Sequence, residues 1–276
     1  LRLCRQFKPA ALLAHMSPVY LIHAYPLARV FGISLALWFV HPSRSKSLVL
    51  AESFGDTILT ALPGSYPGDS PKLRPIGHGI DVTALQQIPP QLNGDILELV
   101  SLGRTSPVKD YPTALRGLAL LTQSGLRVRF SIFGDSITPI EARHRKELVK
   151  VAEGLGVREF FRLLDGVPHS EIGNVLGGAD LLLNGNAGGA DKVIFEAMAA
   201  GKPVVTSNRQ FGHMMPNPEA LLFEPGDPVS LASKIERFAA MSPPERAHLG
   251  ATLRLRVIKE HSLERWADKV VAALSE

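Results

Sequence analysis

The sequence contains very little cysteine: Cys4 is the only one in 276 residues. A single cysteine cannot form an internal disulfide, which fits a reducing compartment such as the cytoplasm. The spacings CxxC and HExxH, which mark common metal sites, do not occur. We therefore expect no metal and no bound cofactor.

Long uninterrupted apolar runs are also lacking. Residues 19–40 are about long enough to cross a bilayer, but they include His23, Pro26 and Arg29. A helix followed by a buried strand is the better interpretation, so we expect a cytoplasmic protein, at most peripheral on the inner face of the membrane. A basic-then-apolar signal sequence is not seen at the start. Because Leu1 is followed so soon by the strand-like segment ALLAH, we expect a fragment whose upstream part is absent.

The net charge of +4 is unevenly spread along the chain. Residues 1–90 hold eight Lys or Arg against four Asp or Glu, whereas the remaining residues hold 22 of each sign. An excess of this kind suits an anionic acceptor or anionic lipid headgroups. A mild surface bias without function is the favoured explanation. We expect no nucleic-acid partner.

Hydrophobic residues make up 45% of the chain and charged residues 20%, which is ordinary globular composition and enough for a buried core. Strand-like segments at 10–15, 33–40, 57–61 and 73–80 alternate with helical segments at 18–31 and 45–54, the pattern of a parallel sheet. A polar, proline-bearing connector follows. The pattern predicts a first domain over residues 1–86 and a linker over 87–94.

A second α/β series starts at residue 95 and runs to 276. Strand-like and helical segments alternate in this series, which ends in an amphipathic helix. The strands are expected at 96–103, 127–134, 160–166, 179–184 and 203–208. Two of the helices are expected at 112–124 and 139–154. Two consecutive α/β domains favour a ligand site in a cleft between them.

The stretch from Asn184 to Val205, NGNAGGADKVIFEAMAAGKPVV, is the centre of this series. It predicts a strand, a glycine-rich loop, a helix and a second strand. A helix that begins after such a loop presents free backbone N–H groups and a positive dipole end to an anion. Glu196 is polar on an otherwise apolar helix, and an ordinary βαβ unit with Glu196 at a solvated edge remains the alternative.

Two cations follow the strand at 96–103. Arg104 and Lys109 are expected at the carboxyl end of that strand, close to the start of the next helix. A guanidinium and an ammonium group at such a place suit a diphosphate. The alternative is a pair of solvated loop cations, but the nearby glycine-rich loop favours phosphate.

Five separated motifs indicate a family, because they follow one another with the order and spacing of a known protein family. They are LVSLGRTSPVKDYPTALRGLALL, FSIFGDS, LLDGVPHSEIGNVLGGADLLLN, FEAMAAGKPVVTSN and LLFEPGDPVSLASKI. Together they resemble the donor domain of the retaining GT4 glycosyltransferases ("glycosyl transferases group 1"). LALWFVH and GHGID resemble the second half of that family's N-terminal domain. The resemblance implies the GT-B fold, two Rossmann-like parallel-sheet domains facing across a cleft, with the N-terminal domain incomplete.

The resemblance also implies roles for individual residues. Arg104 and Lys109 correspond to the residues that hold the donor diphosphate and offset its charge as it leaves. Glu196 corresponds to the second glutamate of Glu-x7-Glu, which binds the ribose hydroxyls. The backbone of Val167 falls where the base is read, and His41 matches a histidine near the anomeric carbon of the donor sugar.

One departure concerns the sugar end of the donor site. The first glutamate of Glu-x7-Glu would fall at position 188, which is glycine. Gly188, Gly189, Ala190 and Lys192 lie where the family contacts the donor, and Lys192 is a candidate contact for sugar or phosphate. Asp191 is expected only to cap the helix.

The implied activity is that of a hexosyltransferase. It would move a sugar from a nucleoside-diphosphate sugar to a hydroxyl of a glycan or lipid-linked acceptor, with retention and without a metal. A non-catalytic nucleotide- or carbohydrate-binding module is one alternative, made plausible by Gly188 and the short N-terminal domain. A GT-B nucleotide-sugar epimerase is another, although no further acid and base residues are identified for it.

Overall fold

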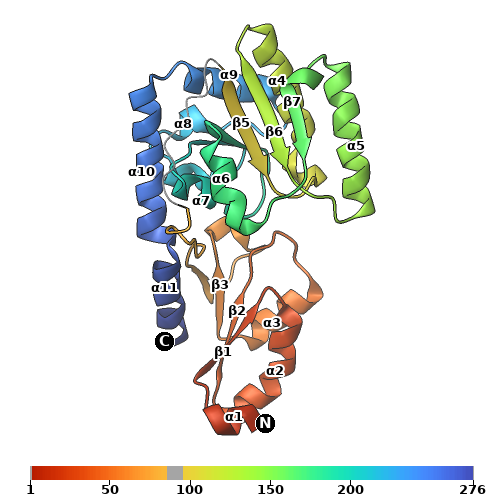
Figure 1. Cartoon of the computed structure of the whole chain (residues 1–276). Coiled ribbons are helices and arrows are strands. Elements are labelled where there is room, and N and C mark those ends of the chain that lie inside the picture. Colours follow the sequence, from red (N-terminus) through yellow and green to blue (C-terminus); the bar gives the residue numbers. More distant parts are fainter. Residues whose placement is uncertain (1, 86–95, 276) are drawn as a thin grey trace. The chain divides into compact units, whose positions relative to one another are not determined.

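The computed structural model describes residues 2–85 and 96–275. Contacts divide the chain into two units, each with one parallel sheet (Figure 1). Unit 1 comprises Leu1–Gly79, Gly188–Ala190 and Glu260–Glu276, and unit 2 comprises Ile80–Ala187 and Asp191–Lys259. The expected linker at 87–94 lies outside the described residues. The C-terminal residues group with unit 1, whereas the expected boundary placed all of 95–276 in one domain.

The sheet of unit 1 has four parallel strands in the order β1-β2-β3-β4. They are β1 (Ala11–His15), β2 (Ser34–Trp38), β3 (Thr57–Thr60) and β4 (Leu73–Pro75). The last is shorter than the strand expected at 73–80, because Pro75 ends it and Gly77 turns the chain with φ +85°. Helix α1 (Arg2–Phe7) was not foreseen.

Helices α2 (Pro18–Phe31) and α3 (Lys46–Phe54) connect the first three strands and pack against each other. Helix α2 spans the residues expected for it: Pro18 stands in the first turn, and Gly32 ends the helix with a left-handed φ of 64°. Helix α3 begins after Ser45, whose side chain accepts from the N–H of Leu48. These helices bury an apolar core that includes Leu21, Leu35 and Ile58.

The final helix, α11 (Leu263–Ser275), belongs to unit 1 and lies on the opposite side of its sheet from α2 and α3 (Figure 1). Trp266 meets Trp38 of β2 edge to face, with ring centroids 5.5 Å apart. This aromatic contact helps to explain why the last residues group with the first sheet rather than with their neighbours in sequence.

The sheet of unit 2 has five parallel strands in the order β7-β6-β5-β8-β9. They are β5 (Leu97–Leu102), β6 (Val128–Phe133), β7 (Phe161–Leu164), β8 (Leu181–Asn184) and β9 (Val204–Thr206). Sequence order therefore runs outward from β5 in one direction and from β8 in the other. In such a sheet, ligands bind outside the carboxyl ends of the strands, where the order reverses.

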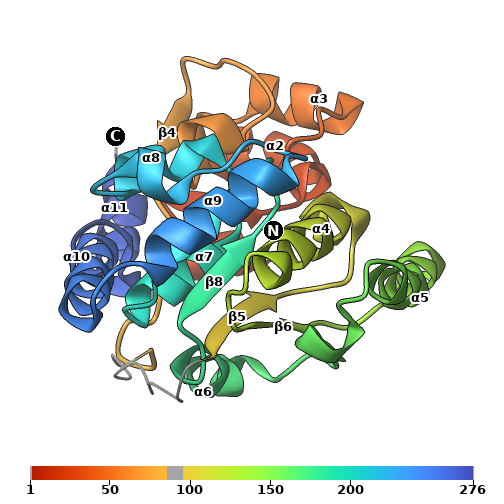
Figure 2. The ribbon, with the colours of Figure 1, turned by 90° about the horizontal axis from the view of Figure 1, so that it is seen from above.

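Helices cover both faces of this sheet. Figure 2 shows α4 (Tyr111–Gln123), α5 (Pro139–Gly154) and α9 (Pro228–Ala239) on one side of β5 and β6, and α6 (Ile172–Gly177) on the other. The remaining helices are α7 (Lys192–Ala199), α8 (Pro218–Leu221) and α10 (Pro243–His261), with short 3₁₀ helices at Pro63–Ser65, Pro107–Lys109, Arg158–Phe160, His169–Glu171 and Arg209–Met214. Helix α5 spans the residues expected for it and begins with a capping box formed by Thr138 and Glu141.

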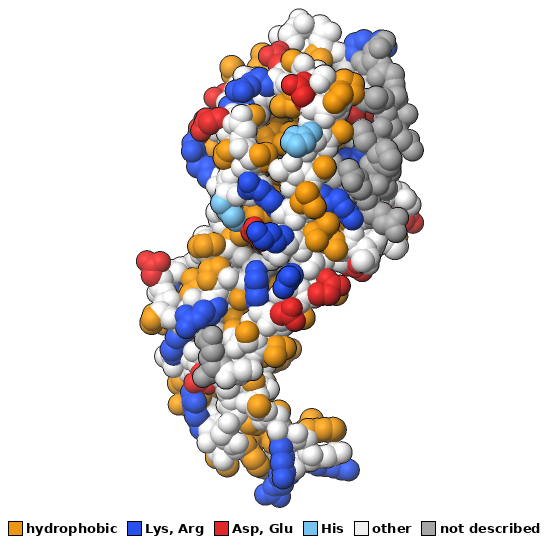
Figure 3. Space-filling model, turned by 90° about the vertical axis from the view of Figure 1, so that its left-hand side faces the viewer, with side chains coloured by type: hydrophobic (Ala, Val, Ile, Leu, Met, Phe, Trp, Pro, Cys, Tyr) orange, Lys and Arg blue, Asp and Glu red, His pale blue; other side chains and the backbone are white. Residues whose placement is uncertain are grey.

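Charged side chains of both signs are interspersed on the face that carries α10 and α11 (Figure 3). Within residues 2–85 and 96–275, no helix is long and apolar enough to cross a membrane.

Candidate donor-binding site

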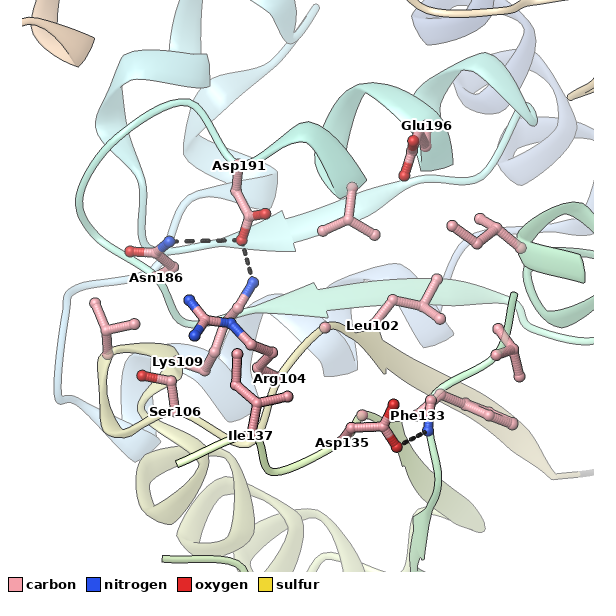
Figure 4. Close-up of a pocket in the computed structure, with 17 residues that line it drawn as sticks. Leu102, Arg104, Ser106, Lys109, Phe133, Asp135, Ile137, Asn186, Asp191 and Glu196 are labelled. Carbon is pink, nitrogen blue, oxygen red and sulfur yellow. Dashed lines mark hydrogen bonds and ion pairs between the residues drawn. The ribbon is translucent and has the colours of Figure 1, made fainter. Parts of the chain in front are cut away.

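A cavity of about 550 Å³ opens at the carboxyl ends of the strands of unit 2. Its walls come from the loops that follow β5, β6, β7 and β8 and from the start of α7, which is where the strand order predicts a ligand. The lining residues are Leu102, Gly103, Arg104, Ser106, Val108, Lys109, Phe133, Gly134, Asp135, Ile137, Gly166, Val167, Ile172, Asn186, Asp191, Val193 and Glu196, and Figure 4 shows how they lie.

Glycines let these loops approach each other closely. Gly103, directly after β5, has φ +121°, a conformation that L side chains rarely adopt. A Cβ at Gly134, directly after β6, would lie 1.9 Å from the carbonyl oxygen of Gly103. Gly166, after β7, donates its N–H to Asp135 Oδ1 at 2.9 Å. The loops are therefore packed backbone to backbone, which leaves the space beyond the strand ends open.

Arg104 is the more accessible of the two expected cations. Its side chain is 57% exposed, and its Nη1 lies 3.1 Å from Glu141 Oε1 at the start of α5. Glu141 also accepts from the N–H groups of Ile137 and Thr138. Burial raises the pKa of Glu141, but these hydrogen bonds and Arg104 outweigh it and hold that pKa below its usual value. The guanidinium is thus tethered at the rim of the cavity by an ionised carboxylate.

Lys109 is largely buried and pairs with a different carboxylate. Its Nζ contacts Asp191 Oδ2, and the two side chains are only 11% and 15% exposed. Asn184 Nδ2 donates to the same oxygen at 2.8 Å. Burial raises the pKa of Asp191, but Lys109 and the neighbouring amides outweigh it and lower that pKa. The carboxylate is therefore ionised at neutral pH, and it pairs with Lys109 inside the wall of the cavity.

Glu196 is buried on α7, so the solvated-edge interpretation is wrong. Its side chain is 5% exposed, and Oε1 meets His169 Nε2 at 2.9 Å and Lys192 Nζ at 3.2 Å. Glu196 lines the cavity, whereas Lys192 is not among the described residues that do. A carboxylate with two partners on one oxygen keeps acceptor capacity on the other.

The structure brings four of the expected site residues together around the cavity: Arg104, Lys109, Val167 and Glu196. His41, Gly188, Gly189 and Ala190 belong to unit 1 and are not among the described lining residues. His41 follows β2, is exposed, and its Nδ1 accepts from the N–H of Ser43 at 3.1 Å.

Two residues have contacts that the sequence did not reveal. Asp191 stands at the N-cap position of α7 as expected, but its side chain does not cap the helix; it binds Lys109 and Asn184 instead. His169 was given no role from the sequence, yet it contacts Glu196. Both partners lie far away in sequence, at separations of 82 and 27 residues. The only local signal was an acidic residue beside a basic one, Asp191-Lys192, at the start of a glycine-flanked helix.

A metal site is not evident in the part of the chain that the structure describes. No group of three or more His, Cys, Asp or Glu is placed there to hold an ion. The positive charges that face the cavity are those of Arg104 and Lys109.

Residues 97–240 match the family described as Glycosyl transferases group 1. The chain belongs to this family. The match includes Arg104, Lys109, Val167, Asp191 and Glu196, so the whole described wall of the cavity lies inside it. The protein is accordingly a glycosyltransferase by family.

Solved structures with the same fold cover the whole chain. HepE from Anabaena, in complex with UDP and glucose, superposes with a TM-score of 0.82 at 18% identity, covering 100% of this chain and 80% of that one. A glycosyltransferase from Rickettsia africae has a TM-score of 0.82 at 15% identity, with coverage of 99% and 78%. Sucrose-phosphate synthase from Thermosynechococcus elongatus has a TM-score of 0.80 at 17% identity, with coverage of 98% and 74%. These likenesses show the GT-B fold. No curated protein matches the sequence.

Proposed function

We propose that this glycosyltransferase moves a hexose from a nucleoside-diphosphate sugar to a hydroxyl acceptor, with retention at the anomeric carbon, as in the GT4 group. The observation that carries the proposal is the cavity of unit 2, which two cations and a buried carboxylate line together. The Anabaena protein HepE, whose structure contains UDP, shares this fold.

The order of the groups along the wall fits the order of groups in such a donor. Figure 4 shows Glu196 on one side and Lys109 with Arg104 on the other. A carboxylate accepts hydrogen bonds from a ribose diol, and a guanidinium with an ammonium binds a diphosphate. Val167, in the loop after β7, lines the same cavity and would present its backbone to the base.

Transfer of the sugar requires mainly that the leaving group is stabilised. The bond between the anomeric carbon and the β-phosphate oxygen breaks, the acceptor oxygen bonds to that carbon, and the proton of the acceptor hydroxyl passes to the departing diphosphate. Negative charge grows on the departing diphosphate, where Arg104 and Lys109 offset it without a metal. His41 would contact the donor sugar near the reacting carbon, as the family resemblance implies.

Calorimetry with UDP and with GDP tests the donor site. We expect one of them to bind the wild-type protein. Glu196→Gln should weaken that binding by about 1.5–3 kcal/mol, because the carboxylate that accepts from the ribose diol is lost. The melting temperature should change little. Glu171→Gln is a matched control, because Glu171 is exposed and lies two residues beyond His169. Wild-type affinity in Glu196→Gln would contradict the ribose role.

A transfer assay tests the activity itself. Release of nucleoside diphosphate from a sugar nucleotide should depend on a hydroxyl acceptor, and His41→Ala should retain nucleotide binding while losing release. Nucleotide binding without acceptor-dependent release from any offered sugar nucleotide would favour the alternative of a binding module. Interconversion of two sugar nucleotides without an acceptor would favour an epimerase.

The acceptor we propose is a glycan or a lipid-linked saccharide, reached in the cytoplasm or at the inner face of the membrane. The support is the excess of Lys and Arg in residues 1–90, which suits an anionic acceptor or surface. Sedimentation with vesicles that contain anionic lipid, compared with neutral vesicles, tests the membrane contact.

A further inference from the structure

Asp191 has an unusual environment for a residue at the start of a helix. Three donors contact the same oxygen, Oδ2: Lys109 Nζ, Asn184 Nδ2 at 2.8 Å, and Asn186 Nδ2 at 3.5 Å. None of the bonds that hold the side chain uses Oδ1, among the residues that the structure describes. The carboxylate is therefore fixed by one oxygen, and the other remains available as an acceptor.

The side chain of Asp191 belongs to the wall of the cavity. Asp191 lines it, and 15% of its side chain is accessible. The group is ionised at neutral pH, because Lys109 and the amides lower the pKa of Asp191 despite its burial. An ionised carboxylate accepts hydrogen bonds and donates none, so its natural partner is a hydroxyl or an N–H group of the ligand.

The position along the wall identifies which part of the ligand lies there. In a nucleoside-diphosphate sugar the nucleoside, the diphosphate and the sugar follow one another in a line. Glu196 faces the cavity on one side of the two cations, and Asp191 with Asn186 lies at the Lys109 end, away from Glu196 (Figure 4). If Glu196 holds the ribose and the cations hold the diphosphate, the next group in line is the sugar.

We propose that Asp191 is a specificity-determining residue that accepts a hydrogen bond from a hydroxyl of the transferred sugar through Oδ1, while Oδ2 holds Lys109 toward the diphosphate. This role rests on the proposed function. The negative charge of Asp191 lies beside the diphosphate site and repels a bare nucleoside diphosphate. The sugar hydroxyl offsets that repulsion, so Asp191 favours the intact donor over the product that must leave.

The test compares each nucleotide with its sugar conjugate, using calorimetry with UDP, UDP-glucose, GDP and GDP-mannose on the wild type and on Asp191→Asn. For the base that binds, we expect Asp191→Asn to weaken binding of the sugar nucleotide by about tenfold or more, the size of one charged hydrogen bond. Affinity for the bare diphosphate should stay the same or rise. Asp165→Asn is the matched control, because Asp165 is exposed, pairs with Arg145 and is not among the lining residues described.

The outcomes separate this role from the proposed function. Equal losses of affinity for the diphosphate and the sugar nucleotide would mean that Asp191 acts only through Lys109. An unchanged affinity for the sugar nucleotide would mean that Asp191 has no role in donor binding. Either result overturns this inference and leaves the proposed function standing. A folded wild type that binds no nucleoside diphosphate overturns the proposed function as well.

A second measurement uses only the wild-type protein, so it does not depend on folding of the variant. Among donors in which one sugar hydroxyl is replaced by fluorine, at least one should lose about tenfold in affinity, because fluorine cannot donate to Asp191. Unchanged affinity across all positions would overturn the inference.

Discussion

Arg104 and Lys109 are five residues apart, but the structure gives them different surroundings. Arg104 is mostly exposed, and its partner Glu141 is also held by backbone N–H groups. Lys109 is mostly buried, and it is the only cation that contacts Asp191 among the described residues. The loss of either cation leaves a buried carboxylate without its countercharge, but Glu141 keeps the backbone N–H groups of Ile137 and Thr138 at a solvated rim, whereas Asp191 is enclosed together with Lys109.

This difference predicts two separable effects of substitution. Arg104→Ala and Lys109→Ala should each weaken nucleoside-diphosphate binding by about 1.5–3 kcal/mol, as for charged hydrogen bonds. Lys109→Ala should in addition lower the free energy of unfolding by about 3 kcal/mol, the cost of breaking a buried pair, while Arg104→Ala stays within about 0.5 kcal/mol of the wild type. Calorimetry and urea unfolding measure the two effects.

The double variant Lys109→Ala/Asp191→Asn supplies the control. Removing the uncompensated carboxylate should restore part of the stability lost in Lys109→Ala, because the buried charge is gone. Equal stability of Lys109→Ala and Arg104→Ala, with no recovery in the double variant, would contradict a buried ion pair.

Asp191 also makes the stability of the folded protein depend on pH. Its pKa is lower in the folded protein than its ordinary value of about 3.9 in an unfolded chain. As the pH falls, the unfolded chain therefore binds a proton at this carboxyl before the folded chain does. The stabilisation that the ionised group gives to the folded protein is complete above about pH 4–5. It is lost as the pH falls below that range to the lowered pKa of the folded state. The difference in unfolding free energy between wild type and Asp191→Asn should accordingly shrink between pH 5 and pH 3 in urea titrations followed by circular dichroism. A constant difference across that range would show that Asp191 has no lowered pKa.

Sequence reasoning located cations more easily than their partners. Arg104 and Lys109 could be predicted because they directly follow a strand, and the carboxyl end of a parallel strand is where phosphates bind. The role of Asp191 could not, since its partner is 82 residues away and residue type alone indicates a helix cap. Burial of Glu196 was equally hidden, because its environment depends on which loops converge on α7.

At the scale of elements, the loops after β5 and β6 approach each other so closely at Gly103 and Gly134 that no side chain fits between these two residues. A Cβ at Gly134 would meet the backbone of Gly103, and each of the two glycines directly follows a strand. Helices with strong local signals were predicted to the residue, as at 18–31 and 139–154, because prolines and caps mark their ends. Helix α1 and the short β4 carry weaker signals, and there the tertiary contacts decide.

Gly134→Ala should therefore disrupt unit 2 and its site together. Its Cβ would lie 1.9 Å from Gly103 O, a backbone atom, so we expect a loss of more than about 2 kcal/mol in unfolding free energy and weaker nucleotide binding. Gly154→Ala is the control, because a Cβ there has nothing within 4 Å and needs no left-handed φ. Thermal unfolding and calorimetry check both. Wild-type stability of Gly134→Ala would show that the two loops are not in contact.

At the scale of the molecule, the two units divide the chain differently from its linear order. The segments 188–190 and 260–276 group with unit 1 although unit 2 precedes each of them. A domain boundary predicted from composition divides the chain at one place. It could therefore separate the two sheets, but it could not assign the segments 188–190 and 260–276 to unit 1. The consequence for function is that the described lining of the cavity belongs to unit 2 alone.

Hydrogen exchange with and without a nucleoside diphosphate tests this assignment. Binding should slow exchange in the loops that line the cavity, at 103–109, 134–137, 166–167 and 191–196, because their N–H groups lose access to water and their local opening is suppressed. The strands of unit 1, β1 to β4, should exchange at nearly the same rate as before, since they contribute none of the described lining. Glu196→Gln serves as the control and should show a smaller effect at equal ligand concentration. Protection confined to β1–β4, with the loops of unit 2 unchanged, would place the nucleotide elsewhere and contradict the donor site.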